Sequence, residues 1–179
     1  LESMQMFIVS KGSAAPGSSD YAYRTLASEG GYRIMVNKQA CCVTIYAGAM
    51  PIKSMICSPG AGTPLGNFNI GQQYRWWTLL GGVKGQFCSR ITGNVLFHSV
   101  PYSAANNRAL ITKYYNQLGQ PVSHGCVRLS VSDAIWIYNN CPPGTSVTIY
   151  NSPDPGPLGR PAPIIIPAGQ TWDPTDPTL

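Results

Sequence analysis

The 179-residue sequence has few acidic residues, few charges overall and almost no histidine. Asp and Glu number 7 against 12 Lys and Arg, charged residues make up 11% of the chain, and there are 2 histidines. The imbalance is concentrated in residues 31 to 150, where nine Lys or Arg face a single acid, Asp133, for a net charge of +8. A field of this sign attracts an anionic polymer.

Nucleic acid is one such polymer, but the sequence lacks the features that would recognise it. The basic residues are scattered, and no helix-turn-helix, zinc-finger or RNA-binding signature occurs. We therefore expect no nucleic-acid partner and favour another polyanion.

Long apolar runs are missing as well. No stretch approaches the about 18 consecutive apolar residues of a membrane-spanning helix, so we expect no membrane span. Residues 1 to 30 lack the basic-then-apolar layout of a signal peptide. If the protein is exported, its targeting or tethering segment is not in this sequence.

The six cysteines are too few for a disulfide-built scaffold and show no C-x-x-C metal spacing. Cys41 and Cys42 are adjacent in a strand-like run, so they point to opposite faces and are expected to be packed. Cys57, Cys88 and Cys141 could supply one bridge or none, and the spacing leaves the pairing open.

Short runs rich in β-branched and aromatic residues dominate the chain from Tyr32 onward. The first three, separated by turn residues, predict a meander, and Ser146–Tyr150 is expected to close the sheet. One helix is predicted over 131–140, because Ser130 and Asp133 form a capping box before it. We expect Ile135 and Trp136 to face the core. The predicted strands are 33–38, 42–46, 52–57, 66–70, 87–91, 94–98 and 146–150.

Composition divides the chain into three parts. Residues 1–30 contain a Gly/Ser-rich stretch typical of a linker or tether remnant, and residues 31–150 form one domain. Residues 151–179 hold eight of the 16 prolines and predict a Pro-rich tail without its own fold. Ile164–Ile166 and Trp172 could pin this tail across the domain; disorder is the alternative.

The most reactive-looking stretch is Ser-His-Gly-Cys-Val-Arg-Leu at 123–129. A catalytic cysteine reacts as the thiolate and needs a base or positive charge nearby, plus N–H groups for the oxyanion it creates. Cys126 is therefore the predicted nucleophile; a buried structural cysteine is the alternative. Gly125 lets the backbone approach a substrate, and His124 and Arg128 raise the local potential.

Two further motifs precede this one: Gly62–Phe68, read Gly-Thr-Pro-Leu-Gly-Asn-Phe, and Leu96–Tyr102, which contains His98. In this order the three motifs resemble the signature of the L,D-transpeptidases with a YkuD-type catalytic domain, over about residues 31 to 150. The resemblance implies a mainly β fold, a YkuD-like β-sandwich or meander with one short helix after the catalytic cysteine. The long spacer at 99–122 is expected to be a partly ordered lid.

The resemblance also implies roles for individual residues. His98 would be the base, oriented by the backbone carbonyl of Ser99, since the capping box already occupies the only acid of the domain. His124 would shape an oxyanion hole whose donors are the N–H groups of Gly125 and Cys126.

Substrate contacts are expected from Arg128, Tyr102 and Ser123, although Arg128 could equally pair and pack. The aromatic cluster Tyr74–Trp77 is either core or a sugar- or peptide-contacting rim of the cleft. No metal or organic cofactor is expected.

The implied activity is cross-linking of bacterial peptidoglycan. A thioester on Cys126 would take the stem tripeptide from a donor tetrapeptide and pass it to an acceptor amine. Hydrolysis by water, an L,D-carboxypeptidase outcome, is the alternative, and a non-catalytic wall-binding module is a third possibility. We further expect a monomer acting outside the cytoplasm at the cell wall, with carbapenems as covalent inhibitors.

Overall fold

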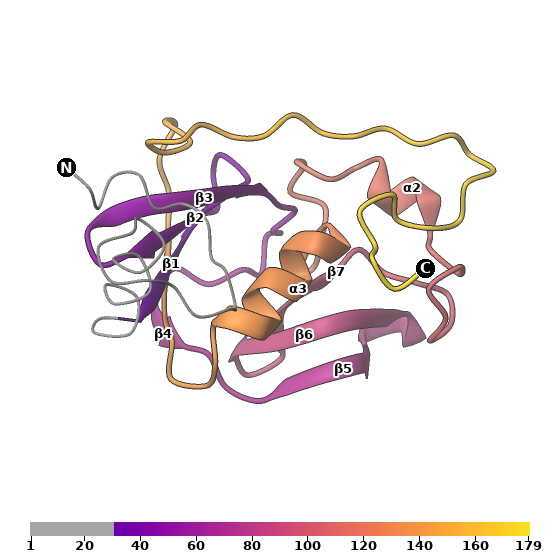
Figure 1. Cartoon of the computed structure of the whole chain (residues 1–179), viewed down its shortest axis with the longest axis horizontal. Coiled ribbons are helices and arrows are strands. Elements are labelled where there is room, and N and C mark those ends of the chain that lie inside the picture. The colour runs from indigo at the N-terminus through magenta and orange to yellow at the C-terminus, as the bar shows by residue number, and fades with distance from the viewer. Residues whose placement is uncertain (1–30) are drawn as a thin grey trace, which may run out of the picture.

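A computed structural model describes residues 31–179, so the predicted linker at 1–30 lies outside the described residues. The fold is mainly β, with two sheets and few helices (Figure 1). The first sheet has the order β3-β2-β1-β9-β4 and the second β5-β6-β7-β8. The strands are β1 (Tyr32–Asn37), β2 (Cys42–Ala47), β3 (Met50–Ile56), β4 (Gly66–Asn69), β5 (Gln73–Thr78), β6 (Lys84–Thr92), β7 (Val95–Ser99), β8 (Val127–Leu129) and β9 (Ser146–Tyr150). The helices are a 3₁₀ turn, η2 (Leu80–Gly82), a single turn, α2 (Thr112–Tyr115), and α3 (Val131–Asn140).

The predicted meander is confirmed, because β1, β2 and β3 pair antiparallel in chain order. β9, expected to close the sheet, instead lies inside it, parallel to β1 and antiparallel to β4. Its alternate residues Val147 and Ile149 are buried. The position of a strand within its sheet depends on which distant strands pair with it. The local sequence pattern of β9 does not specify those partners.

Helix α3 spans the predicted residues and packs against β6 and β7. Its buried side chains are Val131, Ala134 and Ile137, one face of the helix at a spacing of three. Ile135 and Trp136, predicted to face the core, are only partly buried at its margin. The helical period therefore places the core-facing stripe one residue away from the predicted positions.

Half of the predicted capping box is present. The Ser130 hydroxyl accepts a hydrogen bond from the Asp133 N–H at 3.4 Å. The Asp133 carboxylate pairs with Lys53 Nζ of β3 at 3.5 Å, which fixes α3 to the first sheet.

All six cysteines are free, so the bridge considered among Cys57, Cys88 and Cys141 is not formed. Cys41 and Cys42 are buried, as expected. Within residues 31–179 no helix is long and apolar enough to cross a membrane.

The expectation that residues 99–122 form a lid is wrong, because the segment is part of the core. Tyr102 and Tyr115 are among the largest fully buried side chains, and Leu110 and Leu118 are buried with them. Of this segment only Pro101 lines the pocket described below. The segment is the crossover that a parallel β7–β8 pair requires, and it covers the core rather than the pocket.

The Pro-rich tail runs along one side of the molecule from β9 to α2, and the C-terminus lies beside α2 (Figure 1). Asn116 clamps it, donating to the Ile166 carbonyl and accepting from the Ile166 N–H, each at 2.9 Å. Ile166 is 6% exposed, whereas Ile164 and Ile165 are exposed. The apolar run therefore contributes one side chain to the core.

The Asp133–Lys53 contact predicts a small stability effect without a catalytic one. Asp133→Asn should lower the melting temperature by about 2 to 4 °C, since a partly exposed ion pair contributes up to about 1 kcal/mol. The rate at which the Cys126 thiol reacts with an electrophile should stay within about threefold. Thermal unfolding of Asp133→Asn, Lys53→Gln and the double variant tests this. The double variant should have the same melting temperature as each single variant, because all three lose the same ion pair. A folded Asp133→Asn protein with an unreactive thiol would contradict a purely structural role.

Candidate active site

The site is set by the parallel pairing of β7 with β8, which places His98 opposite Arg128. Paired residues project to the same face of a sheet, and so do residues two apart along a strand. Cys126 is two residues before Arg128, and Leu96 is two before His98. Cys126, His98, Arg128 and Leu96 therefore share one face, while Phe97, Val127 and Leu129 point into the core, where each is fully buried.

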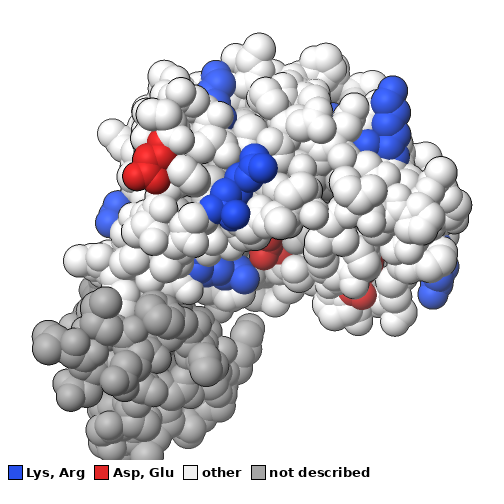
Figure 2. Space-filling model, turned by 90° about the horizontal axis from the view of Figure 1, so that it is seen from above, with Lys and Arg blue, Asp and Glu red and all other residues white. Residues whose placement is uncertain are grey.

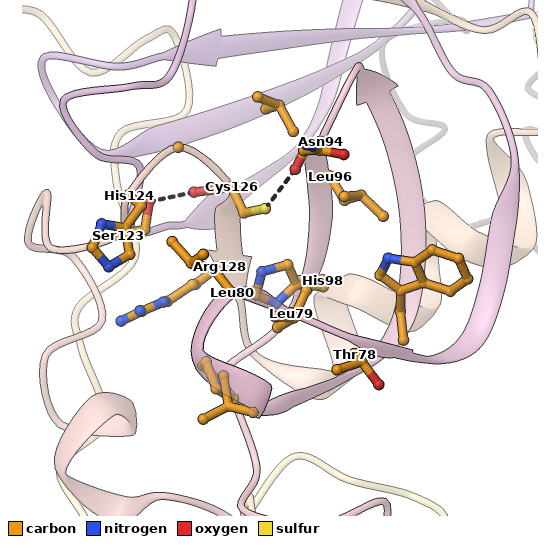
Figure 3. A pocket seen from close by; sticks show the side chains of 15 residues that line it. Thr78, Leu79, Leu80, Asn94, Leu96, His98, Ser123, His124, Cys126 and Arg128 are labelled. Atoms are coloured by element: carbon orange, nitrogen blue, oxygen red, sulfur yellow. Dashed lines mark hydrogen bonds between the residues drawn. The ribbon is translucent and has the colours of Figure 1, made fainter.

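A pocket of about 380 Å³ opens on this face, a size typical of small-ligand sites (Figure 3). Its far wall is the loop that carries η2. The lining residues are Trp77, Thr78, Leu79, Leu80, Val83, Asn94, Val95, Leu96, His98, Pro101, Ser123, His124, Gly125, Cys126 and Arg128. The predicted nucleophile and base are thus brought into one pocket, and the cover comes from residues 77–83 rather than 99–122.

The Cys126 thiol is half-buried, and its sulfur lies 3.3 Å from the Asn94 carbonyl oxygen (Figure 3). Burial raises the pKa of this thiol, while the Leu96 backbone and the charges of Arg128 and Arg90 lower it in part. At neutral pH the resting group is therefore the thiol, which needs a base to react.

His98 is buried, and its Nδ1 contacts the Ser99 carbonyl oxygen. A carbonyl only accepts, so Nδ1 carries the proton and Nε2 keeps a free lone pair. Burial lowers the pKa of His98 to about 4, against the Ser99 contact, which raises it. The ring is thus a neutral base with a fixed tautomer.

Gly85 on β6 makes room for this ring. A Cβ at Gly85 would lie 3.1 Å from both Cγ and Nδ1 of His98, tighter than an ordinary contact. A glycine inside a strand often marks such a close approach, so the sequence carried a signal for this position that our prediction did not use.

A second loop fixes the backbone around Cys126, the predicted nucleophile. The Gly62 N–H donates to the His124 carbonyl at 2.8 Å. The Thr63 hydroxyl donates to the Gly125 carbonyl at 2.7 Å and accepts from the Gly60 N–H at 2.9 Å. Two successive carbonyls are therefore held on the side of the Gly60–Thr63 loop.

The N–H of a trans peptide points away from its carbonyl. Anchoring the carbonyls of His124 and Gly125 therefore turns the N–H groups of Gly125 and Cys126 to the opposite side. Within residues 31–179 neither N–H donates to a protein acceptor. These are the two donors predicted for the oxyanion hole, and they are oriented and free.

This close approach depends on glycine. A Cβ at Gly60 would lie 1.7 Å from the Ser123 carbonyl oxygen, and one at Gly62 would lie 2.3 Å from that of His124. The Gly-Thr-Pro motif noted in the sequence thus has a structural role in the site, through Gly62 and Thr63.

Three predicted site residues have other positions than expected. Tyr102 is fully buried and its hydroxyl accepts from Gln86, so the prediction that it contacts substrate is wrong. The Ser123 hydroxyl donates to the Cys126 carbonyl and closes the nucleophile turn. The His124 ring is exposed and points away from Cys126, and His124 contacts the Gly60–Thr63 loop through its carbonyl (Figure 3).

Arg128 extends along the pocket with its guanidinium 4.8 Å from the centre of the Tyr114 ring. Its Nη1 is buried and has no hydrogen-bond partner within the described residues. Burial lowers the pKa of this guanidinium. A buried unpaired donor costs about 1 to 3 kcal/mol and is normally explained by a missing partner.

The aromatic cluster Tyr74–Trp77 was predicted to be either core or a rim of the cleft, and the structure shows some of each. Trp76 packs edge-on against Tyr102, its centroid 5.2 Å away, and belongs to the core margin. Trp77 stacks on Tyr74 at 3.9 Å, is 38% exposed and lines the pocket. The cluster is therefore core on one side and pocket wall on the other.

Charges on the face in Figure 2 are dispersed. Lys and Arg side chains stand apart from one another, and few acidic side chains are visible. No stripe of positive charge forms on that face. Among residues 31–179 no group of three or more His, Cys, Asp or Glu is placed to hold a metal ion.

Comparison with known proteins identifies the class. A family model described as the L,D-transpeptidase catalytic domain, YkuD, matches residues 31–149. YciB of Bacillus subtilis (strain 168), which carries the same family name, is 32% identical over 115 residues, or 59% of this chain and 58% of YciB. The chain therefore belongs to the YkuD L,D-transpeptidase domain family and spans less than two thirds of this relative.

Solved structures share the fold. An L,D-transpeptidase from Mycobacterium tuberculosis H37Rv superposes with a TM-score of 0.55 at 22% identity, covering 67% of this chain and 57% of the other. LdtMt1 in complex with imipenem gives 0.54 at 22% identity, covering 67% and 60%. At this identity the likeness concerns the fold.

Thr63 tests the carbonyl anchors. Thr63→Val keeps the shape but removes both hydroxyl bonds, so the Gly125–Cys126 peptide can turn its N–H away from the pocket. Losing one oxyanion donor costs about 10²- to 10³-fold; we expect acylation of Cys126 to slow by about 10- to 100-fold. Thr63→Ser keeps the hydroxyl and should react within about threefold of the wild type. Acylation rates, with circular dichroism to verify folding, decide the point. If a folded Thr63→Val protein is acylated at the wild-type rate, the Thr63 hydroxyl does not contribute to the site.

Proposed function

We propose that this chain is the catalytic domain of a peptidoglycan L,D-transpeptidase that works through a thioester on Cys126. The observation that carries the proposal is the tautomer of His98. Its Nδ1 is held by the Ser99 carbonyl, which leaves Nε2 as a proton acceptor in the pocket that also holds the thiol. A wall-binding module without catalysis has no need of a reactive thiol beside such a base.

In the first half-reaction His98 Nε2 takes the thiol proton as Cys126 Sγ attacks the carbonyl carbon between the third, L-centred residue and the fourth, D-alanine. The oxyanion receives hydrogen bonds from the Gly125 and Cys126 N–H groups. The C–N bond then breaks, and His98 returns the proton to the leaving amine of D-alanine. The products are free D-alanine and a tripeptide thioester.

In the second half-reaction an amine from the side chain of another stem attacks the thioester. His98 removes its proton, the C–S bond breaks, and the thiol is regenerated with a new amide cross-link. Water in place of the amine gives a free tripeptide, the carboxypeptidase outcome. Incubating a donor tetrapeptide with and without an acceptor stem separates the two, since only transfer gives a cross-linked dimer.

Arg128 would bind a carboxylate of the stem peptide. Its buried Nη1 has no hydrogen-bond partner among residues 31–179 and lies on the side chain that lines the pocket beside Cys126. A carboxylate would complete its hydrogen bonding with a charge-assisted bond. Trp77 would supply the apolar wall for the rest of the stem.

The proposal sets the place and mode of action. Peptidoglycan lies outside the cytoplasm, so the domain would act at the bacterial cell wall, in wall organisation and the maintenance of cell shape. The excess of basic residues from 31 to 150 favours an anionic wall polymer.

Imipenem provides the first test, because it is bound in the related LdtMt1 structure. Incubation should add the mass of one imipenem, on Cys126 alone, and Cys126→Ala should remain unmodified. The other five cysteines are buried and should stay free. Intact mass and peptide mapping give the answer. An adduct on Cys57 or Cys88, or one that survives Cys126→Ala, would exclude Cys126 as the nucleophile.

The pH dependence of acylation tests the base. His98 accepts a proton only when neutral, and its pKa is lowered to about 4. The rate should therefore be half-maximal near pH 4 and flat toward neutrality, rather than half-maximal near the ordinary value of about 6.5.

His98→Ala should be slower by about 10²- to 10⁴-fold. Its rate should climb about tenfold per pH unit, because only thiolate formed by free hydroxide would react. The exposed ring of His124 makes His124→Ala the matched control, expected within about threefold. If His98→Ala keeps the wild-type dependence of the acylation rate on pH, another residue is the base.

A further inference from the structure

The last residues of the chain contain one three-residue unit twice, Asp-Pro-Thr at 173–175 and at 176–178. Asp173 Oδ1 accepts from the N–H and hydroxyl of Thr175 at 2.8 and 2.7 Å. Asp176 Oδ1 accepts from the same groups of Thr178 at 2.7 and 2.6 Å. Each unit thus closes its own turn with one carboxylate oxygen and leaves the other, Oδ2, for a distant partner.

The first unit holds the start of α3. Asp173 is fully buried, and its Oδ2 accepts from the Val131 N–H at 2.9 Å. Thr175 accepts from the Ser132 N–H at 3.1 Å. The first N–H groups of a helix have no partner within it, and a negative charge there is favourable. α3 begins two residues after β8, the strand that follows Cys126.

The second unit holds the base through β6. Asp176 is 7% exposed, and its Oδ2 accepts from Gln86 Nε2 at 3.3 Å. The Gln86 N–H donates to the Ser99 hydroxyl at 3.0 Å, and the Ser99 carbonyl contacts His98 Nδ1. A continuous set of contacts therefore joins Asp176 to the base.

The Gln86 side chain has a fixed orientation in this network. Arg75 donates to its Oε1 at 2.7 Å, so Nε2 is the atom presented to the Tyr102 hydroxyl, at 2.7 Å, and to Asp176. Phe87, next along β6, has a φ of 52°, which interrupts the regular ladder. The interruption is consistent with the Gln86 N–H bonding a side chain rather than a strand carbonyl.

We propose that the two Asp-Pro-Thr units are positioning elements of the active site, Asp176 for the base His98 and Asp173 for the strand of the nucleophile. The inference rests on the proposed function and adds the tail to the catalytic unit. The tail lies beyond residues 31–149, which the family model covers, so the domain is completed by residues outside that match.

Asparagine variants separate this role from general packing. An Asn has one oxygen where Asp has two, and Gln86 cannot reverse its amide while Arg75 holds Oε1. Asp176→Asn must therefore give up either its Thr178 turn or its Gln86 bond, and Asp173→Asn faces the same choice with Val131. Asp154→Asn is the matched control: Asp154 is exposed in the same tail and closes a turn with the Gly156 N–H at 3.2 Å.

Two readouts are needed, the rate of acylation by imipenem and the titration of His98 by NMR. We expect Asp176→Asn to slow acylation about tenfold at saturating imipenem, with the half-saturating concentration unchanged. The His98 pKa should rise from about 4 toward about 6.5 as water reaches the ring. Removing the carboxylate charge alone would lower this pKa, so a rise reports lost burial. The other titratable or charged groups that face His98 are Cys126 and Arg128. Neither of them is changed in the asparagine variants.

Asp154→Asn should leave both readouts at wild-type values. A folded double variant, Asp173→Asn with Asp176→Asn, that keeps the wild-type rate and His98 titration would overturn the proposal. If the double variant does not fold, Asp176→Asn decides by the same criteria. Should the wild type itself fail to acylate, the proposed function fails, and the NMR titration still decides the positioning role.

Discussion

The parallel pairing of β7 with β8 is the constraint on which the site depends. It puts His98, Arg128 and Cys126 on one face of the second sheet and sends the alternate residues into the core. Parallel neighbours cannot be joined by a tight turn, so the chain must leave Ser99 and return at Ser123. The long crossover of residues 99–122, which carries the buried Tyr102 and Tyr115, follows from this one pairing.

Burial then decides the chemistry of the face. The pocket raises the pKa of the Cys126 thiol and lowers that of His98 to about 4, so the resting pair is neutral rather than a thiolate with an imidazolium. In the proposed mechanism charge develops only during attack, where the low dielectric makes fixed dipoles effective. The Gly125 and Cys126 N–H groups would meet this need, because the carbonyls of their peptides are hydrogen-bonded to Gly62 and Thr63.

Support for Cys126 and His98, the two groups proposed to react, comes from three distant parts of the chain. The Gly60–Thr63 loop orients the nucleophile turn, Gly85 makes room for the base, and the tail reaches both through Asp173 and Asp176. Precision in a site requires such outer contacts, because the reacting side chains do not fix their own orientation. A domain that ended at β9 would lack the third of these supports.

The sequence by itself predicted seven of the nine strands and the helix at 131–140, because these depend on local periodicity, and it singled out Cys126 and His98 through residue chemistry and the family resemblance. It did not predict β5, which was interpreted only as an aromatic cluster, or the three-residue β8. It also placed the Ser99 carbonyl beside His98, since one acid in the domain left few alternatives. Tertiary structure alone decided the interior place of β9, the burial of Tyr102, the pocket wall at 77–83 and the two aspartate contacts of the tail. Those features join segments that lie far apart in the chain. The local sequence pattern of one segment does not specify which distant segment will pack against it in the folded core.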